Sequence, residues 1–362
     1  MTDESYIKLA VELAKKGMGK VSPNPLVGCV IIKDERIIGA GYHEKFGGNH
    51  AEVNAINSAR ENLEGASLYI NLEPCSHQGK TPPCVDKIIE KKIKRVVVGT
   101  LDMNPMISGA GVKKLKAAGV EVKVGLLEKE CVELNKFFFK YITQKIPYVT
   151  LKAAQTIDGK IADTAGNSKW ISSIASRRRV HSMRTKYDAV LVGAGTVLSD
   201  DPSLTVRLTE GRNPKRIILD SNLDLTSEYK IIRNNSDKNL IVVTSKKSIS
   251  KKRRIKKLNS LGAKVLFARE NKNGMINLKS AMLELAKNEI ASILVEGGSE
   301  IYTSFVRENL FDNIVLFISP KILGPGLSFV NAFGKGTLKN ALKVKFVNVE
   351  TIDEDLLVEL AQ

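Results

Sequence analysis

Apolar positions along the first 145 residues switch between the spacing of helices and the alternation of strands. Residues 26–32 and 37–42 are two apolar runs joined by the polar segment Lys33-Asp34-Glu35-Arg36, which predicts a β-hairpin. After it, helical and strand patterns alternate, and this favours helices packed on a central sheet. We expect helices near 3–16, 50–61, 84–92, 111–118 and 131–141, and strands at 67–72, 95–99 and 120–124.

The alternation starts again after Pro147, so we place a domain boundary near residue 145 and expect two α/β domains, 1–145 and 146–362. The tail, 344–349 and 355–360, has the pattern of a closing antiparallel pair. In between we expect strands at 148–154, 188–193, 215–219, 239–244, 264–268, 291–295 and 313–319, and helices at 173–186, 249–261, 278–287 and 299–309.

Composition narrows the class of protein. With 362 residues, 43% of them hydrophobic, the chain can build two cores. The first residues carry acids and lack the apolar stretch of a signal peptide, and no run approaches the roughly 18 apolar residues that span a bilayer. We therefore expect a cytoplasmic protein without a membrane partner. Cys29 and Cys131 lie in apolar surroundings and are expected to be buried small hydrophobes.

The formal net charge of +17 is compatible with nucleic acid, with anionic small substrates, or with a lysine-rich composition alone. Lysines occur along the whole chain, which favours the last two. The densest basic run, residues 251–257, falls in a predicted helix that ends near Gly262, and we interpret it as a solvated helix face.

One imidazole, one carboxylate and two thiols occupy defined places between residues 50 and 84. The chain reads His50-Ala51-Glu52, then Pro74-Cys75, then Pro83-Cys84. This order of His-x-Glu and two cysteines is the signature of zinc-dependent deaminases. Cys84 opens a predicted helix, where the helix dipole and free N–H groups favour the thiolate that zinc requires.

Three protein ligands leave one coordination position for water, and Glu52 lies beside them as a candidate proton shuttle. The alternative is a structural zinc with a fourth ligand, for which His43 and His77 are available. If the protein is a non-enzymatic binding protein with such a structural zinc, Glu52→Ala is expected to leave all activity and binding unchanged.

Two strands of the second half run into glycine turns. Residues 188–192 lead into Gly193-Ala194-Gly195-Thr196, and residues 291–295 lead into Glu296-Gly297-Gly298-Ser299. Backbone N–H groups at such turns can hold phosphate. Neither turn matches the Gly-x-Gly-x-x-Gly of a Rossmann domain, so simple turn geometry remains an equal alternative at this point.

Longer motifs give the family. Eight residues separate Cys75 from Cys84, where a nucleic-acid deaminase usually has two. With Ser22–Gly28 in the first half, and Leu151–Ala162, Ser168–Ser172 and Gly193–Arg207 in the second, the whole chain resembles the bifunctional riboflavin-biosynthesis family, which joins a pyrimidine deaminase to a pyrimidine reductase. The segment Asp102–Met106 departs from the family pattern, which more often has Pro after the Asp, and this concerns only the shape of a loop.

The resemblance implies a cytidine-deaminase-like three-layer domain followed by a dihydrofolate-reductase-like domain that uses NADPH. It implies zinc on His50, Cys75 and Cys84, with Glu52 catalytic and Asn24 in the base pocket. The cofactor contacts it implies are Ala154, Trp170, Thr196, Asp200, Ser221 and Gly298, and the substrate contacts are Ser168, Arg184, Leu204, Arg207 and Glu296, with Lys152 near the reacting sugar.

The expected reactions follow from the same resemblance. The first domain would remove the amino group from the ring of 2,5-diamino-6-ribosylamino-4(3H)-pyrimidinone 5′-phosphate, and the second would reduce the ribosyl group to ribityl. The expected partner is this phosphorylated pyrimidine, not nucleic acid, and the protein is expected to be a homo-oligomer. A nucleic-acid deaminase is the competing hypothesis, and it predicts strongly salt-dependent binding of RNA or DNA.

Overall fold

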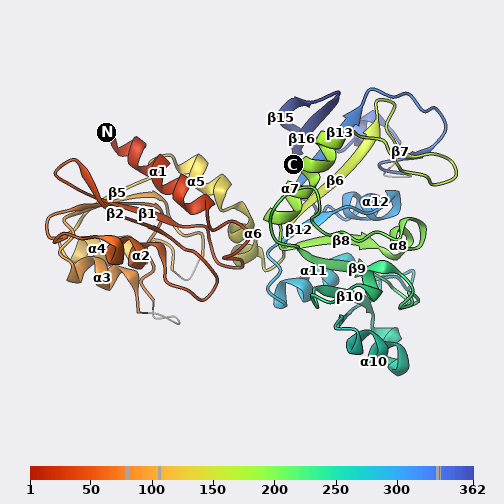
Figure 1. The fold of residues 1–362 in the computed structure, drawn as a ribbon, viewed down its shortest axis with the longest axis horizontal. Helices are drawn as coiled ribbons and strands as arrows, with labels where there is room; N and C mark the ends of the chain where they lie inside the picture. Colours follow the sequence, from red (N-terminus) through yellow and green to blue (C-terminus); the bar gives the residue numbers. More distant parts are fainter. Residues whose placement is uncertain (78–81, 105–106, 332–333, 335) are drawn as a thin grey trace. The chain divides into compact units, whose positions relative to one another are not determined.

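The computed structural model describes residues 1–77, 82–104, 107–331, 334 and 336–362. The chain divides into two compact units, Met1–Lys145 (unit 1) and Ile146–Gln362 (unit 2), which Figure 1 shows in the colours of the sequence. No helix among these residues is both long enough and apolar enough to cross a membrane.

Unit 1 is built on a five-stranded sheet of order β2-β1-β3-β4-β5 in the described part of the chain. The predicted hairpin is β1 with β2, β1 also pairs antiparallel with β3, and β3, β4 and β5 are parallel. The strands are β1 (Gly28–Lys33), β2 (Arg36–Tyr42), β3 (Ser67–Leu72), β4 (Arg95–Thr100) and β5 (Glu121–Val124), and the helices are α1 (Asp3–Lys15), α2 (Ala51–Ser58), α3 (Cys84–Glu90), α4 (Ala110–Ala117), α5 (Glu128–Leu134) and α6 (Lys136–Gln144).

Alternation along the strands fills two cores, one on each face of this sheet. In β3, Leu68 and Ile70 join the core under α2, α3 and α4, whereas Tyr69 joins the core under α1 and α5. Successive strand residues point to opposite faces, so one apolar run can serve both layers. Figure 1 shows α1 and α5 on one side of the sheet and α2, α3 and α4 on the other.

The predicted helix at 131–141 is wrong in one respect, because the structure breaks it into α5 and α6 at Asn135. The Asn135 side chain accepts a hydrogen bond from the Leu26 N–H (2.8 Å) and donates one to the Leu26 carbonyl (3.0 Å). Asn71 binds the same segment, accepting from the Gly28 N–H (2.8 Å) and donating to the Leu26 carbonyl (2.9 Å). The break therefore lies where a side chain holds the start of β1.

Unit 2 contains a nine-stranded sheet of order β11-β10-β9-β8-β12-β6-β13-β16-β15 in the described residues. The strands from β11 to β13 are parallel, and β16 and β15 close the sheet in antiparallel fashion, as the tail pattern predicts. The strands are β6 (Tyr148–Thr156), β8 (Ala189–Gly193), β9 (Lys215–Leu219), β10 (Leu240–Ser245), β11 (Lys264–Ala268), β12 (Ser292–Val295), β13 (Asn313–Ser319), β15 (Lys345–Ile352) and β16 (Asp355–Ala361).

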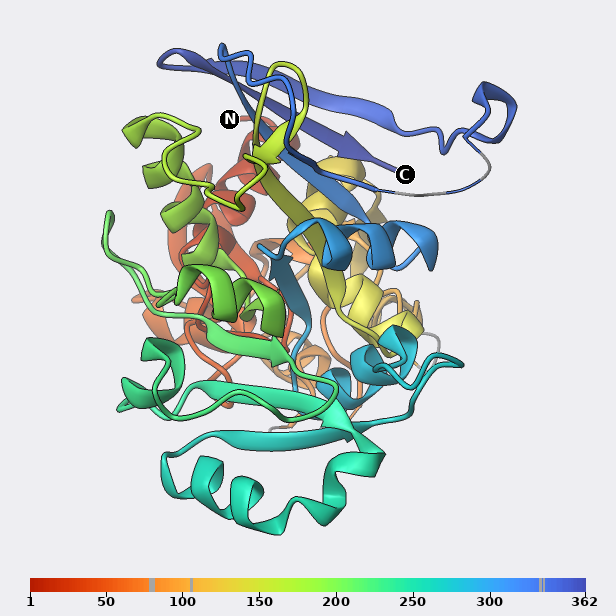
Figure 2. The ribbon, with the colours of Figure 1, turned by 90° about the vertical axis from the view of Figure 1, so that its right-hand side faces the viewer.

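The helices of unit 2 lie between these strands in the chain, and most match the predicted ranges. The pattern did not predict α8, α9 or the short pair β7 (Lys160–Ala162) and β14 (Leu327–Ser328). The helices are α7 (Ile174–Lys186), α8 (Ala194–Asp200), α9 (Lys230–Arg233), α10 (Lys252–Ser260), α11 (Leu278–Lys287) and α12 (Ser299–Arg307), with 3₁₀ turns η1 (Lys246–Ser250) and η2 (Leu338–Asn340). Figure 2 shows this unit from the side, with β15 and β16 along one edge of the sheet and η1 and α10 beyond the other.

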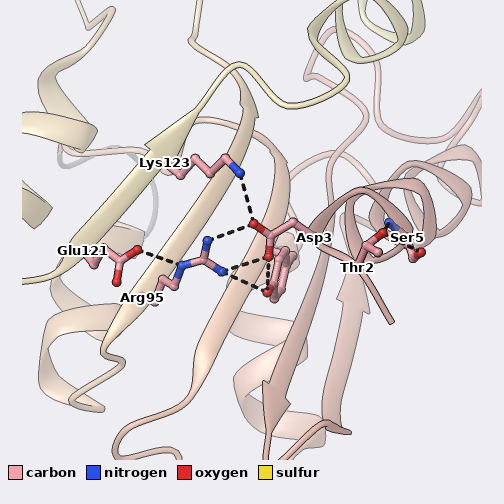
Figure 3. A network of polar contacts seen from close by, with 7 residues as sticks. Thr2, Asp3, Ser5, Arg95, Glu121 and Lys123 are labelled. Carbon is pink, nitrogen blue, oxygen red and sulfur yellow. Dashed lines mark hydrogen bonds and ion pairs between the residues drawn. The ribbon is translucent and has the colours of Figure 1, made fainter.

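A charged network ties the first helix of unit 1 to three strands. The Arg95 guanidinium donates to both Asp3 carboxylate oxygens, each at 2.9 Å, and its Nε donates to Glu121 at 2.9 Å. The Tyr69 hydroxyl (2.8 Å) and the Lys123 ammonium (3.3 Å) also donate to Asp3 (Figure 3). These donors, above all Arg95, hold the pKa of Asp3 well below its usual range.

We expect Asp3→Asn to lower the free energy of unfolding of unit 1 by about 1–2 kcal/mol near neutral pH. A carboxylate with a lowered folded-state pKa contributes stability that is complete above its unfolded pKa of about 4 and is lost as the pH falls further. The difference from wild type should therefore shrink below about pH 4. Urea unfolding, followed by hydrogen exchange of the unit 1 sheet, measures it.

Glu4→Gln is the matched control, because Glu4 is an exposed acid in the same first turn of α1. It should leave the unfolding free energy nearly unchanged at both pH values. A destabilisation by Asp3→Asn that is equal at pH 3 and pH 7 would show that the ion-pair network is not its cause.

Candidate active site

The predicted metal ligands of unit 1 come together from three elements. His50 is the N-cap of α2, Cys75 follows β3, and Cys84 is the first residue of α3. Their ligand atoms all lie within 4.8 Å of one another. The His50 Nδ1 is 3.5 Å from the Cys75 sulfur and 3.3 Å from the Cys84 sulfur. A tetrahedral zinc ion, with bonds of about 2.3 Å to sulfur and about 2.0 Å to nitrogen, needs similar ligand separations, about 3.5 Å.

Hydrogen bonds between the two cysteines favour the thiolate form that binds a metal cation. The Cys84 thiol and backbone N–H both donate to the Cys75 sulfur, the N–H at 3.3 Å. The hydrogen bond from the Cys84 thiol is the main cause that holds the pKa of Cys75 well below its ordinary value. Zinc, when bound, would replace the proton in this hydrogen bond between the two sulfur atoms.

Glu52 lies beside these ligands on the first turn of α2, and its side chain is only 3% exposed. Burial, and then the neighbouring Cys75, raises the pKa of Glu52 to about 7, against the influence of His50. A buried carboxyl group with a pKa near neutrality can both accept and return a proton. This placement agrees with the predicted role as a shuttle.

Neither alternative fourth ligand joins the cluster. His43 is buried and uses both ring nitrogens, because Nδ1–H donates to the Asn49 carbonyl (2.8 Å) and Nε2 accepts from the Asn24 amide (3.1 Å). Burial lowers the pKa of His43, consistent with this neutral form. His77 is exposed. Two segments lie outside the described residues. They are residues 78–81, between the two cysteines, and residues 105–106, in the loop that departs from the family pattern.

Glu73 is a residue that sequence reasoning missed. It is 6% exposed, at the end of β3, and its carboxylate accepts from the N–H groups of Asp102 (3.1 Å), Gly109 (2.9 Å) and Val112 (3.1 Å). A side chain on Gly111 would approach the Pro74 carbonyl oxygen to 2.2 Å, so the backbones are close there. Glu73 thus joins the strand that leads to Cys75 to the start of α4. The position of this acid, directly before Pro74-Cys75, was the sequence signal that could have identified it.

Unit 2 has a cleft of about 700 Å³ at the carboxyl ends of β8, β9 and β12, the usual binding edge of a parallel sheet. Of the six predicted cofactor contacts, Thr196, Ser221 and Gly298 line it. Ser299, the first residue of α12, lines the cleft as well and was not predicted. Its hydroxyl is buried and has no hydrogen-bond partner among the residues that the structure describes. Its place after Gly297-Gly298 was the signal that could have found it.

The other three predicted cofactor contacts lie outside the lining of this cleft. Ala154 is on β6, and Asp200 is the last residue of α8. Trp170 is 64% exposed, which excludes the role of a core anchor, and the Arg177 guanidinium stacks on its ring at 4.1 Å. Lys321 donates to the carbonyls of Trp170 (3.0 Å) and Ile171 (2.8 Å).

The predicted substrate residues include a buried charge cluster. Arg184 donates from Nε and Nη2 to the two oxygens of Glu296 (2.7 and 2.9 Å), and Nη1 donates to the Thr205 carbonyl. The Lys152 Nζ lies 3.8 Å from Oε2 of Glu296. Burial alone would raise the pKa of Glu296, but Arg184 and Lys152 outweigh it and lower this pKa to about 2. Arg184 is therefore the ion-pair partner of Glu296, another of the predicted substrate contacts.

Arg207 lies next to this cluster. Its guanidinium donates to the Thr205 hydroxyl (2.8 Å), and its N–H donates to His181 Nδ1 (2.8 Å). Burial first, and then Arg184 and Arg207, lower the pKa of His181 to about 4, so the ring is neutral and its Nδ1 is an acceptor. Leu204 is buried, with a φ of 53°, and Ser168 is half-buried.

Comparison with known proteins covers both units. Residues 1–100 match the cytidine and deoxycytidylate deaminase zinc-binding region, and residues 147–358 match the RibD C-terminal domain. These matches confirm the predicted fold classes and their order along the chain.

Full-length relatives agree. The riboflavin biosynthesis protein RibD of Aquifex aeolicus is 49% identical over 98% of this chain and 97% of its own, and that of Escherichia coli is 36% identical over 99% of both. The crystal structure of a diaminohydroxyphosphoribosylaminopyrimidine deaminase/5-amino-6-(5-phosphoribosylamino)uracil reductase from Thermotoga maritima is 45% identical, with a TM-score of 0.87 over 99% of this chain and 98% of that one. Acinetobacter baumannii RibD, 36% identical, gives a TM-score of 0.89 over 99% and 98%.

We expect Glu73→Gln to destabilise unit 1 by about 1–3 kcal/mol, because the amide presents N–H groups to backbone N–H donors that need an acceptor. Zinc should also be released faster to a chelator, since Cys75 loses its support. Chelator-induced zinc release and urea unfolding measure the two effects. Glu90→Gln, on the exposed side of the helix that carries Cys84, is the control. Equal release rates in the two variants would contradict the positioning role of Glu73.

Proposed function

The chain belongs to the RibD family of bifunctional riboflavin biosynthesis enzymes, a deaminase joined to a reductase, and on that premise we propose its substrates and the residues that act on them. Unit 1 removes ammonia from 2,5-diamino-6-ribosylamino-4(3H)-pyrimidinone 5′-phosphate. Unit 2 then reduces the ribosyl group, giving 5-amino-6-(5-phospho-D-ribitylamino)uracil. The observation that carries the first step is the cluster of one imidazole and two thiols with a buried carboxyl group beside it.

In unit 1, His50, Cys75 and Cys84 would hold the zinc that this family region binds. When bound, zinc acts as a Lewis acid and makes water a nucleophile at neutral pH. Glu52 takes the proton from the attacking water and gives it to the departing amino group, which leaves as ammonia. Asn24, hydrogen-bonded to His43 next to His50, orients the base.

In unit 2, the cleft lined by Thr196, Ser221 and Gly298 receives NADPH. Ser299 supports this assignment, because its buried hydroxyl, at the start of a nine-residue helix beside the cleft, has no hydrogen-bond partner in the described part of the chain. A helix N-terminus with a free hydroxyl donor suits the cofactor's pyrophosphate. The resemblance adds Ala154, Trp170 and Asp200 to the cofactor contacts, and it is also the ground for NADPH in preference to NADH.

The substrate side of unit 2 is the cluster around Glu296. Arg184 holds the Glu296 carboxylate in place, and burial lowers the pKa of Lys152, a direction that eases proton donation from its ammonium. We assign Lys152 to the reacting sugar, and Arg207, which is exposed, to the phosphate. Ser168 and Leu204 complete the set. When bound, NADPH would supply the hydride that the sugar C1′ receives as its bond to the ring oxygen breaks, and Lys152 would supply the proton that this oxygen takes up, so that ribose opens to ribityl.

We also propose that the protein works in the cytoplasm, where its metal-binding thiols stay reduced, and that it is a homo-oligomer. The edge strand β15 favours self-association, because Phe346, Val347 and Val349 are 75%, 61% and 55% exposed there. Exposed apolar edge strands are rare unless another chain covers them. Sedimentation velocity decides this point, and a monomer at micromolar concentration would contradict it.

Glu52→Ala should lower ammonia release by about 10²–10⁴-fold, because the proton then has no carrier. Reduction of the deaminated intermediate by NADPH should stay at the wild-type rate, and zinc content should stay at one ion. The assay supplies the diaminopyrimidine phosphate or its deaminated product and follows ammonia and NADPH absorbance separately. Glu61→Ala, at an exposed acid of the same unit, is the control. Loss of both activities in a folded Glu52→Ala protein would contradict the two-site assignment.

Ser299→Ala should raise the dissociation constant for NADPH about tenfold, the effect of one lost hydrogen bond to a charged group. Ammonia release should not change. Ser304→Ala is the matched control in the same helix and cleft, because the Ser304 hydroxyl already donates to the Glu300 carbonyl (2.8 Å). Titration of cofactor fluorescence measures the binding. Equal dissociation constants for Ser299→Ala and wild type would remove Ser299 from the cofactor site.

A further inference from the structure

The excess positive charge of this protein is concentrated in one segment. Residues 228–272, which we call the basic lobe, contain fourteen lysines and arginines and three acids, a net charge of +11 out of +17 for all 362 residues. One eighth of the chain therefore carries about two thirds of the net charge. This concentration differs from the even distribution that the sequence reading assumed.

The basic lobe forms one edge of unit 2. It comprises α9, β10, η1, α10 and β11, and β11 is the end strand of the sheet. Every one of its fourteen cations is exposed except Lys251, which is half-buried. Figures 1 and 2 show α10 beyond the β10–β11 edge, the part of unit 2 that carries the run Lys252–Lys257.

The basic lobe adjoins the cleft of unit 2 directly. The Lys251 ammonium donates to the Asn222 carbonyl (2.6 Å) and to Asp224 (2.9 Å), and Arg254 donates to the Leu223 carbonyl (2.6 Å) and to Asp224 (2.9 Å). Asn222 and Asp224 line the cleft. Lys247 donates to the Gly274 carbonyl (2.8 Å), between the lining residues Asn273 and Met275. Lys247, Lys251 and Arg254 thus contact two segments that line the cleft.

We propose that the basic lobe is an electrostatic steering surface that raises the rate at which the anionic dinucleotide cofactor enters the cleft. The inference rests on the proposed use of NADPH in unit 2. A cluster of like charges beside a cleft raises the local concentration of counter-charged ligands and their association rates. NADPH carries a charge of about −4 and NADH about −2, so the same field favours the phosphorylated cofactor kinetically.

Nucleic acid is the other polyanion that such a surface could attract, and the structure favours the cofactor. Single-strand binding surfaces combine basic grooves with exposed aromatic rings on which bases stack. The aromatic residues of the basic lobe, Tyr229 and Phe267, are half-buried. Lys247, Lys251 and Arg254 contact segments that line a cleft of small-molecule size. The electrostatic field of the basic lobe therefore acts at that cleft.

The test compares two triple charge reversals in the full-length protein. Lys252→Glu/Arg253→Glu/Lys256→Glu changes three exposed cations of α10 that are outside the cleft lining. The control variant, Arg178→Glu/Lys287→Glu/Lys339→Glu, changes the net charge equally, at exposed positions of unit 2 outside both the cleft lining and strand β15. Stopped-flow fluorescence of the reduced cofactor gives the association and dissociation rate constants, and circular dichroism with thermal unfolding confirms that unit 2 is folded in each variant.

We expect the α10 variant to bind NADPH at least about fivefold more slowly than the control variant at low ionic strength, with the dissociation rate unchanged. The loss should be smaller for NADH and should vanish near 0.5 M salt, where the Debye length is only about 4 Å. Equal association rates in the two variants at low salt would overturn the proposal. So would unchanged cofactor association together with micromolar RNA binding that only the α10 variant loses. A wild-type protein that binds no NADPH would instead contradict the proposed function itself.

Discussion

Unit 1 depends on a distance constraint: one nitrogen and two sulfur atoms, from residues up to 34 positions apart, must lie about 3.5 Å from one another. Each ligand therefore occupies the end of an element. His50 caps α2, Cys75 follows β3, and Cys84 opens α3. Element ends are defined to within a fraction of an ångström only if the elements are packed rigidly, which is why the two cores on either side of the sheet matter to the chemistry.

Buried polar side chains supply the remaining precision around that cluster. Asn71 and Asn135 bind the backbone at Leu26–Gly28, next to Asn24, and Glu73 accepts three backbone N–H groups on the way to Cys75. Each of these groups would be costly to bury without partners. Their contacts are therefore specific, and they position the loops that neither helix nor strand geometry determines.

Unit 2 is arranged differently from unit 1. Its parallel strands end together at one edge, where the Gly193 and Gly298 turns and the start of α12 line a cleft, and the buried Ser299 hydroxyl there has no hydrogen-bond partner among the described residues. Unit 2 has two groups of positive side chains, one buried and one exposed to solvent. Arg184 and Lys152 are buried around Glu296, so their net field is small and local, whereas the cations of the basic lobe face solvent and act over a Debye length.

Most elements of this protein follow from the apolar pattern, because strand and helix periods are local properties of the chain. The ranges predicted for β3, β9, β11, β13 and α11 agree with the structure residue by residue. The predictions failed where a side chain is used for a distant contact. Asn135 interrupts a helical pattern in order to bind Leu26, and short elements such as α8 and β7 have too few residues to show a period.

The sequence by itself determined the metal-site inventory, the order of the two domains and the family, since residue types and their spacing along the chain carry all three. Only the tertiary structure decided that the three ligand atoms lie close enough together to bind one metal ion. It alone also shows that Arg184 pairs with Glu296 and that Trp170 is exposed beneath Arg177. It also showed that His43 is buried with both ring nitrogens hydrogen-bonded and that His77 is exposed, so neither is a fourth ligand. The physical reason is the same throughout: which partner a charged or polar group selects depends on distances between segments that lie far apart in the chain.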